Sequence, residues 1–138
     1  MRFLSDYMIK DHKEFEKVFN DFGDNIGSSH LMEYFLKFKW NLTAHLAVEE
    51  KIIFINYNPE TEEDAGMMEK ILEEHRELIS LMDDIEDRLN DGKDVDISHL
   101  KRMLIEHRNF EDEVLYPMLD NKIDENTKKQ IITKLENQ

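Results

Sequence analysis

The sequence predicts an all-α protein: an up-down-up-down four-helix bundle with a short C-terminal fifth helix. Only four Gly and two Pro occur among 138 residues, so few positions interrupt a helix. Apolar residues recur at steps of three and four along four long segments, which places them on one face of a helix. No segment alternates as a strand does. Short connections between four such helices favour antiparallel neighbours.

Four groups of turn-forming residues mark where the helices end. They lie at 23–29, at 56–61, at 90–96 and around Pro117, Asp120 and Asn121. The four helices of the bundle are therefore expected at about 3–22, 29–56, 61–90 and 97–119, and the fifth helix at about 124–136. Side chains that typically cap a helix N-terminus precede the second, third and fourth helices: Ser28 or Ser29, Thr61, and Asp96.

The buried face of each helix follows from the same spacing. The first helix should bury Met8, His12, Phe15, Phe19 and Phe22. The second should bury Leu31, Phe35, Phe38, Leu42, His45, Glu49 and Ile52. The third should bury Met68, Leu72, His75, Ile79 and Met82, and the fourth Leu100, Leu104, His107, Glu111, Val114 and Met118. We also expect Trp40 and the phenylalanines in the core.

The composition restricts the possible classes of function. With 18 basic and 32 acidic side chains the net charge is −14, which argues against nucleic acid or an anionic membrane as a partner, since both require basic patches. The absence of Cys excludes disulfides, thiolate metal sites and cysteine nucleophiles. No apolar run approaches the roughly 20 residues of a membrane helix, and the first residues lack the pattern of a signal peptide. We therefore expect a cytoplasmic protein with one domain over residues 1–138.

An internal repeat relates the two halves of the chain. Segment 45–54 (HLAVEEKIIF) aligns with 107–116 (HRNFEDEVLY) at an offset of 62 residues. Both segments contain His, then Glu four residues later, then an acid, two aliphatic residues and an aromatic one. Segment 9–19 aligns more weakly with 72–82 at an offset of 63. The repeat predicts two helix pairs that are related by a pseudo-two-fold axis.

Six residues on the predicted buried faces are polar: His12, His45, Glu49, His75, His107 and Glu111. Burying such groups without partners costs of order a few kcal/mol each. The four histidines follow one another at 33, 30 and 32 residues, one per helix and near its middle, so in an antiparallel bundle they could converge in one layer. Imidazole and carboxylate suit iron, manganese or zinc. Six ligands exceed what one tetrahedral zinc needs, so a two-metal site with bridging Glu fits better.

Other polar residues near these positions fit plainer roles. Three His have Glu four residues later where about one is expected by chance, but the third pair, His12 and Glu16, places Glu16 beside the stripe. We therefore do not expect Glu16 as a ligand. His30 and His99 are expected on the surface. The acids nearest the ligand histidines could accept hydrogen bonds from them, although most should face solvent: Asp11, Glu14, Glu74 and Glu106.

The segments HLAVEE (45–50) and EHRNFEDEVLYP (106–117), with the isolated pairs DH (11–12) and EH (74–75), resemble the hemerythrin-like HHE cation-binding family. The resemblance covers about residues 8–120. It implies a four-helix bundle that holds two non-haem iron ions, oxo- or hydroxo-bridged, with Mn or Zn as substitutes. The bundle would span about 3–120, and residues 121–138 would form a tail. Carried over by position, the ligands would be His12, His45, Glu49, His75, His107 and Glu111.

One position departs from the pattern of the oxygen-carrying hemerythrins, which have a further His one turn after the ligand of the third helix. Here that position is Ile79. The set of four His and two Glu is instead similar to that of the di-iron proteins that repair iron centres, but those proteins also have a Cys-bearing N-terminal region, which this chain lacks. An aliphatic Ile79 would leave a coordination position free for water, O2 or NO.

The leading functional prediction is a module that binds or senses O2, NO or an oxidant such as peroxide. A di-iron enzyme acting on peroxide or NO is an alternative, ranked lower because the predicted core contains no additional general acid or base. An iron-handling or iron-centre repair protein is another. Ferritin-type sites typically use Glu-x-x-His, which no His here shows. A phosphotransfer domain needs one exposed His, whereas four lie on the buried faces.

Overall fold

A computed structural model describes residues 4–137; residues 1–3 and 138 of the predicted domain, and with them the expected first residue of the first helix, lie outside the described residues. The first half contains α1 (Leu4–Asp24), α2 (Leu31–Val48), the π-helical segment η1 (Glu49–Ile53) and the 3-10 turn η2 (Phe54–Asn56). The second half contains α3 (Glu62–Asn90), α4 (Ser98–Phe110), the π-helical segment η3 (Glu111–Leu115), α5 (Tyr116–Lys122) and α6 (Glu125–Glu136).

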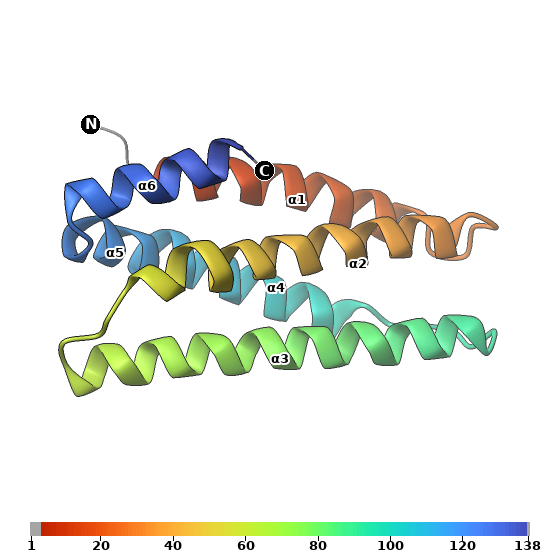
Figure 1. Ribbon diagram of the computed structural model, residues 1–138. Helices are drawn as coiled ribbons and strands as arrows, with labels where there is room; N and C mark the ends of the chain where they lie inside the picture. The colour runs from red at the N-terminus through yellow and green to blue at the C-terminus, as the bar shows by residue number, and fades with distance from the viewer. Residues whose placement is uncertain (1–3, 138) are drawn as a thin grey trace.

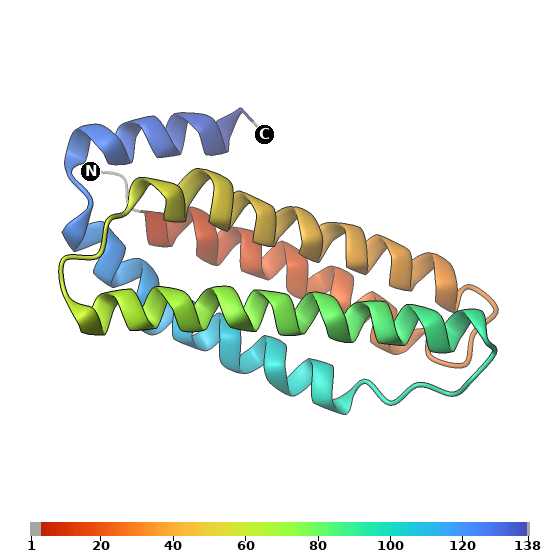
Figure 2. The same cartoon turned by 60° about the horizontal axis from the view of Figure 1, so that its bottom comes forward.

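The helices form an up-down-up-down bundle. Figures 1 and 2 show α1, α2 and α3 running alternately in opposite directions, with α4 returning beside α3 and continuing through η3 into α5. The chain then reverses, and α6 runs back along one side of the bundle, where it contacts η1. The predicted fold class, including the short C-terminal helix, is confirmed.

The two π-helical segments shift the buried face by one residue, which corrects part of the sequence prediction. Each begins at one of the predicted ligand glutamates and accommodates an extra residue in its turn. The spacing of three and four therefore fails after Glu49 and Glu111. The buried residues beyond these points are Ile53, Leu115 and Leu119 instead of Ile52, Val114 and Met118, and Val114 is 45% exposed.

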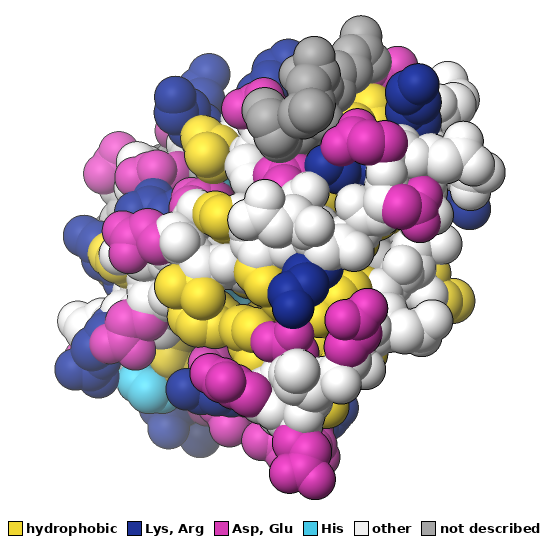
Figure 3. Space-filling model, turned by 90° about the vertical axis from the view of Figure 1, so that its left-hand side faces the viewer, with side chains coloured by type: hydrophobic (Ala, Val, Ile, Leu, Met, Phe, Trp, Pro, Cys, Tyr) yellow, Lys and Arg dark blue, Asp and Glu magenta, His cyan; other side chains and the backbone are white. Residues whose placement is uncertain are grey.

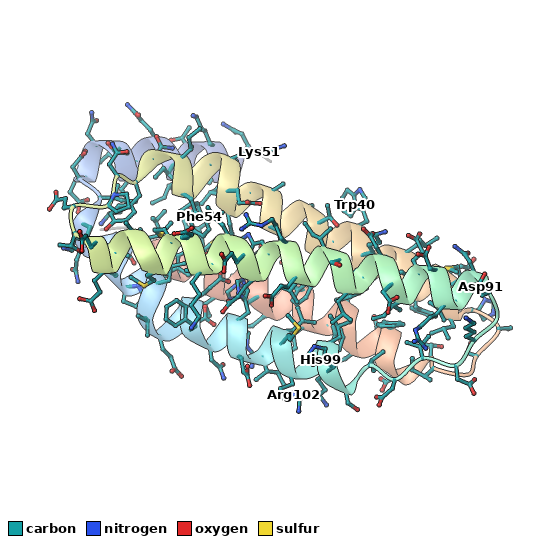
Figure 4. All side chains as sticks on the ribbon, turned by 90° about the horizontal axis from the view of Figure 1, so that it is seen from below. Trp40, Lys51, Phe54, Asp91, His99 and Arg102 are labelled. Atoms are coloured by element: carbon teal, nitrogen blue, oxygen red, sulfur yellow. The ribbon has the colours of Figure 1, made fainter. Side chains whose placement is uncertain are left out.

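Trp40 also differs from the prediction, because it is 72% exposed and lies on the outside of α2 (Figure 4). It stands two residues after Phe38, which is fully buried. At about 100° per residue, two residues place a side chain on nearly the opposite face of a helix. The described phenylalanines are buried except Phe110, which is partly buried.

The core consists of two apolar clusters separated along the bundle axis. One is rich in Phe and lies between α1, α2, α3 and α4; it contains Phe15, Phe19, Phe22, Phe35, Phe38, Leu42, Leu46, Leu78, Met82, Ile85, Leu100 and Leu104. The other lies toward α5 and α6; it contains Leu4, Met8, Ile53, Phe54, Tyr57, Met68, Ile71, Leu115, Tyr116, Leu119, Ile123, Ile131 and Ile132. The six polar residues of the predicted site fall between these clusters in every helix.

None of the helices within residues 4–137 has the length and apolar character that crossing a membrane would need. Figure 3, which faces the end of the bundle where α2 leads into α3, shows apolar side chains gathered among acidic and basic ones.

The predicted caps are partly as expected. Thr61 caps α3 by accepting a hydrogen bond from the Asp64 N–H (3.1 Å). The N-cap position of α4 is Ile97, yet the Asp96 carboxylate accepts from the Ser98 N–H at 2.9 Å and so satisfies the first turn. At α2 the N-cap is His30, which makes no side-chain cap, and Ser28 accepts from its N–H instead.

The C-terminus of α3 depends on Gly92. Its φ of +70° is a left-handed conformation, and the N–H groups of Gly92 and Lys93 donate to the carbonyls of Leu89 (3.1 Å) and Arg88 (2.9 Å). This pair of bonds is a Schellman cap, which satisfies carbonyls that the helix leaves without partners.

Two exposed glycines, Gly66 inside α3 and Gly92 at its C-terminal end, should change the stability of the protein in opposite directions when alanine replaces them. Gly92→Ala should lower the free energy of unfolding by about 1 kcal/mol, because alanine is strained at positive φ. Gly66→Ala should raise it by about 0.5–1 kcal/mol, since Gly66 lies inside the helix with open space around it. Urea unfolding of both variants measures the two changes, and equal signs would contradict this account.

Candidate metal centre

The six predicted site residues meet in one buried layer at the middle of the bundle. Each of the four long helical rods contributes one His, and the two glutamates open η1 and η3. The layer is almost closed to solvent: the exposed fractions are His12 3%, His45 6%, Glu49 0%, His75 1%, His107 7% and Glu111 0%. The helix positions chosen from the spacing thus do converge.

Two groups of donor atoms can be distinguished, and each could hold one cation. The first cation position is formed by His12, His45 and Glu111, and the second by Glu49, His75, His107 and Glu111. Within each group the donor atoms lie within 4.8 Å of one another. Glu111 belongs to both groups, so its two carboxylate oxygens can face two neighbouring cations.

At the first cation position the two imidazoles come from the antiparallel pair α1 and α2. Nε2 of His12 lies 3.2 Å from Nε2 of His45 and 3.1 Å from Oε1 of Glu111. Nε2 of His45 is also 3.0 Å from Oε1 of Glu49, one turn later in the same rod. The donor atoms of His12, His45 and Glu111 thus lie close together.

At the second cation position the imidazoles come from α3 and α4, and their ring centroids are 5.0 Å apart. Nε2 of His107 lies 3.2 Å from Oε2 of Glu111, one turn later. Nε2 of His75 lies 3.6 Å from Oε1 of Glu49. Glu49 therefore faces an imidazole of each pair, as a second bridging carboxylate would.

Four carboxylates at the edge of the layer face the outward nitrogens of the imidazoles. Asp112 lies 2.8 Å from Nδ1 of His12, and Glu74 lies 2.9 Å from Nδ1 of His107. Asp11 is hydrogen-bonded to Nδ1 of His45. Glu50 is farther from Nδ1 of His75, at 3.6 Å. An imidazole that donates its outer N–H to a carboxylate turns its inner nitrogen toward a metal.

Sequence reasoning found half of these four carboxylates. Asp11 and Glu74 were among the acids considered as hydrogen-bond acceptors, while Glu14 and Glu106, considered with them, are exposed. Asp112 and Glu50 were missed. The four share adjacency, because each directly precedes or follows a predicted ligand in the sequence, but Glu106 shares it too and is exposed.

Tyr116 is a further site residue that sequence reasoning did not single out. It is fully buried, and its hydroxyl donates to Oε2 of Glu49. Burial, with the charges of Glu111 and Glu49 next, raises the pKa of Tyr116 well above its ordinary value, so the hydroxyl keeps its proton. Its counterpart in the repeat, Phe54, has no hydroxyl and stacks on His75 with centroids 5.9 Å apart.

The unpaired atoms of the layer show that it suits cations. Several buried side-chain atoms have no hydrogen-bond partner: Glu49 Oε1, His75 Nδ1 and Nε2, His107 Nε2, and both carboxylate oxygens of Glu111. Leaving such atoms unpaired in a dry interior costs of order 1–3 kcal/mol each. Imidazole nitrogens and carboxylate oxygens are also the donors that iron, manganese and zinc accept. Cations at the two positions would satisfy these atoms.

The protonation of the layer reflects the same need for positive charge. Burial lowers the pKa of His107, but the Glu111 carboxylate 3.2 Å from Nε2 and the hydrogen bond with Glu74 outweigh burial and raise the pKa to about 10. For His45 burial is likewise outweighed, mainly by the charge of Glu49, and the pKa lies well above its ordinary value. Burial raises the pKa of the Glu111 carboxyl and lowers the pKa of His75. Protons therefore balance the carboxylates until a cation replaces them.

Comparison with protein families gives one match. The family described as "Hemerythrin HHE cation binding domain" matches residues 4–119. The chain belongs to this family. No curated protein and no solved structure matches the chain. The match covers α1 to α5 up to Leu119 and includes all six residues of the buried layer, so this HHE domain contains a buried His/Glu cluster that suggests a metal site.

The residues that the sequence did not predict as ligands lie away from the buried layer. Glu16 forms an ion pair with Arg108 at 2.7 Å on the surface. His30 is exposed beside Glu33, and His99 lies near Arg102 on the outside of α4 (Figure 4). Ile79 packs against the Phe-rich cluster, so this helix position of the HHE domain supplies no metal donor.

Cation affinity of the HHE domain should rise with pH. The pKa of His107 is raised above that of a free imidazole, so below pH 10 its ring holds a proton that a cation must displace. Each displaced proton changes the affinity by about tenfold per pH unit. Titration with Co2+ at pH 4, 5, 6 and 7, with a pH indicator to detect released protons, measures the slope. An affinity that stays flat from pH 7 down to pH 4 would contradict this assignment.

Proposed function

We propose that this HHE domain holds two iron ions between its four helices and binds or senses a small ligand or oxidant there, such as O2, NO or peroxide. The observation that carries the proposal is the pair of donor groups that share Glu111 inside one buried layer. Manganese or zinc could occupy the same donors. Bound iron would supply reversible redox chemistry and a Lewis acid.

The side chains in and around the buried layer would have different roles in holding the two ions. His12 and His45 would hold one ion, and His75 and His107 the other. Glu49 and Glu111 would bridge the two, and the outer carboxylates would keep the imidazoles turned inward. The two apolar clusters exclude water on both sides of the layer, which favours an uncharged diatomic ligand over water.

The place for such a ligand follows from Ile79. One turn after His75, it adds no imidazole to the second cation position and packs among apolar side chains. With His75 as the ligand from α3, the second ion would keep a free coordination position. Binding or sensing at that position requires no further group from the chain.

A di-iron enzyme acting on peroxide or NO is a second candidate, and one observation favours it. The Tyr116 hydroxyl is a buried O–H donor beside Glu49, in a layer where the other facing groups are imidazoles and carboxylates. A hydrogen-bond donor aimed at the site could assist proton transfer to a bound oxidant. Multiple turnover with peroxide or NO, reduced by Tyr116→Phe, would favour the enzyme over the sensor.

Metal analysis tests the proposal directly. Protein produced with ample iron should contain about two metal ions per chain, and its optical spectrum should change when O2 or NO is added to the reduced form. Fewer than about half a metal ion per chain would contradict the proposal.

His45→Ala should remove at least one metal ion per chain and lower the melting temperature of the loaded protein, because a bound cation stabilises the folded state. His30→Ala is the matched control, since His30 is exposed and lies outside the layer. Unchanged metal content and melting temperature in His45→Ala would show that His45 is not a ligand.

A further inference from the structure

The two cation positions are not equivalent, although the repeat relates them. We propose that the second cation position is an exchangeable one, filled last and emptied first through an opening between α3 and α4, while the first position retains its cation. The proposal rests on the proposed function, because it assumes that the layer takes two cations. The ligand of the exchangeable position is a divalent transition-metal cation.

The first observation is how the imidazoles are oriented. Both imidazoles of the first position have a carboxylate on Nδ1: Asp112 is at 2.8 Å from His12, and Asp11 is hydrogen-bonded to His45. At the second position only His107 is oriented in this way. His75 is 1% exposed, yet neither of its ring nitrogens has a hydrogen-bond partner, because Glu50 is 3.6 Å away.

This difference sets the expected order of affinities. Removing an orienting partner of a metal-binding His typically costs about 10–100-fold in affinity. Glu50 and Asp112 are counterparts in the repeat, at an offset of 62 residues. Glu49 and Glu111 each lie near an imidazole of both positions, so the carboxylates do not separate the two. Asp112 reaches its imidazole and Glu50 does not, so the second position should bind its cation at least about tenfold more weakly.

The second observation is access from solvent. A cavity of about 280 Å³ lies between α3 and α4, and His107 forms part of its wall together with Leu78 and Phe110. Glu74, Glu77 and Glu106 line it and outnumber its basic residues, Lys70 and His107, so its charge attracts metal ions. A ligand of the second position therefore borders an opening to the surface.

The equivalent cavity beside the first position differs. It has a volume of about 270 Å³ and is lined by Asp11, Glu14 and Val48, but by none of the six residues of the buried layer. Leu135 of α6 forms part of its wall. The C-terminal helix α6 thus covers the side of the bundle next to the first position. Within residues 4–137, no second helix of this kind covers the side next to the second position.

The test is a titration of the full-length protein with Co2+, followed by visible absorption and by competition with a chelator. We expect two steps that differ at least about tenfold in affinity. His75→Asn should abolish the weak step and leave the tight one, whereas His12→Asn should abolish the tight step. Two steps of equal affinity, or loss of the tight step in His75→Asn, would overturn the inference. Failure of the protein to bind two cations would instead overturn the proposed function.

Two pairs of repeat-related variants test the causes without removing a ligand. Asp112→Asn should weaken the tight step about tenfold, and Glu50→Gln should change the weak step less than twofold, since Glu50 does not reach His75. Glu77→Gln should slow Co2+ uptake about twofold at low salt, whereas Glu14→Gln should leave the rate unchanged. A large effect of Glu50→Gln would show that Glu50 anchors His75, and a slower rate in Glu14→Gln alone would place the access route at α1 and α2. Either result would overturn the proposal.

Discussion

The structure depends on the compensation of charge in one dry layer. Two carboxylates and four imidazoles lie between apolar clusters that admit almost no solvent. Placing ionised groups in such surroundings costs several kcal/mol for each charge unless an opposite charge is close. In the absence of a metal the imidazoles supply that charge by retaining protons, as the raised pKa values of His45 and His107 show. The buried layer therefore favours bound cations over uncharged groups.

The bundle orients these donors by a pattern of adjacent residues. In Asp11–His12 and Glu74–His75, one residue points into the layer and the one before it reaches the imidazole of the neighbouring helix. Consecutive residues on a helix differ by about 100°, so one can face the centre while the next faces the adjacent helix. Each pair of an acidic residue and a histidine thus links two helices of the bundle. The side chains that shape the site therefore also hold the helices in register.

The two candidate cation positions differ where the two repeats diverge. Tyr116 replaces Phe54 and adds a hydroxyl that donates to Glu49. Glu50 falls short of its imidazole, whereas Asp112 reaches its own. α6 lies over one side of the bundle alone (Figure 1). The repeated scaffold with these asymmetric additions gives the two candidate cation positions different surroundings.

The helical periodicity by itself determined the fold class, the helix boundaries to within a few residues, and the six polar residues of the layer, because each of these depends on local spacing along one helix. The tertiary structure decided what spacing cannot encode. It showed that the π-helical segments after Glu49 and Glu111 advance the buried face by one residue, and that Trp40 lies outside. It also showed that Asp112 and Tyr116 reach predicted ligands on other helices, and that Glu50 lies 3.6 Å from His75 without a hydrogen bond. These contacts join residues about 25 to 100 positions apart, and which of them meet depends on how the rods pack rather than on any one rod.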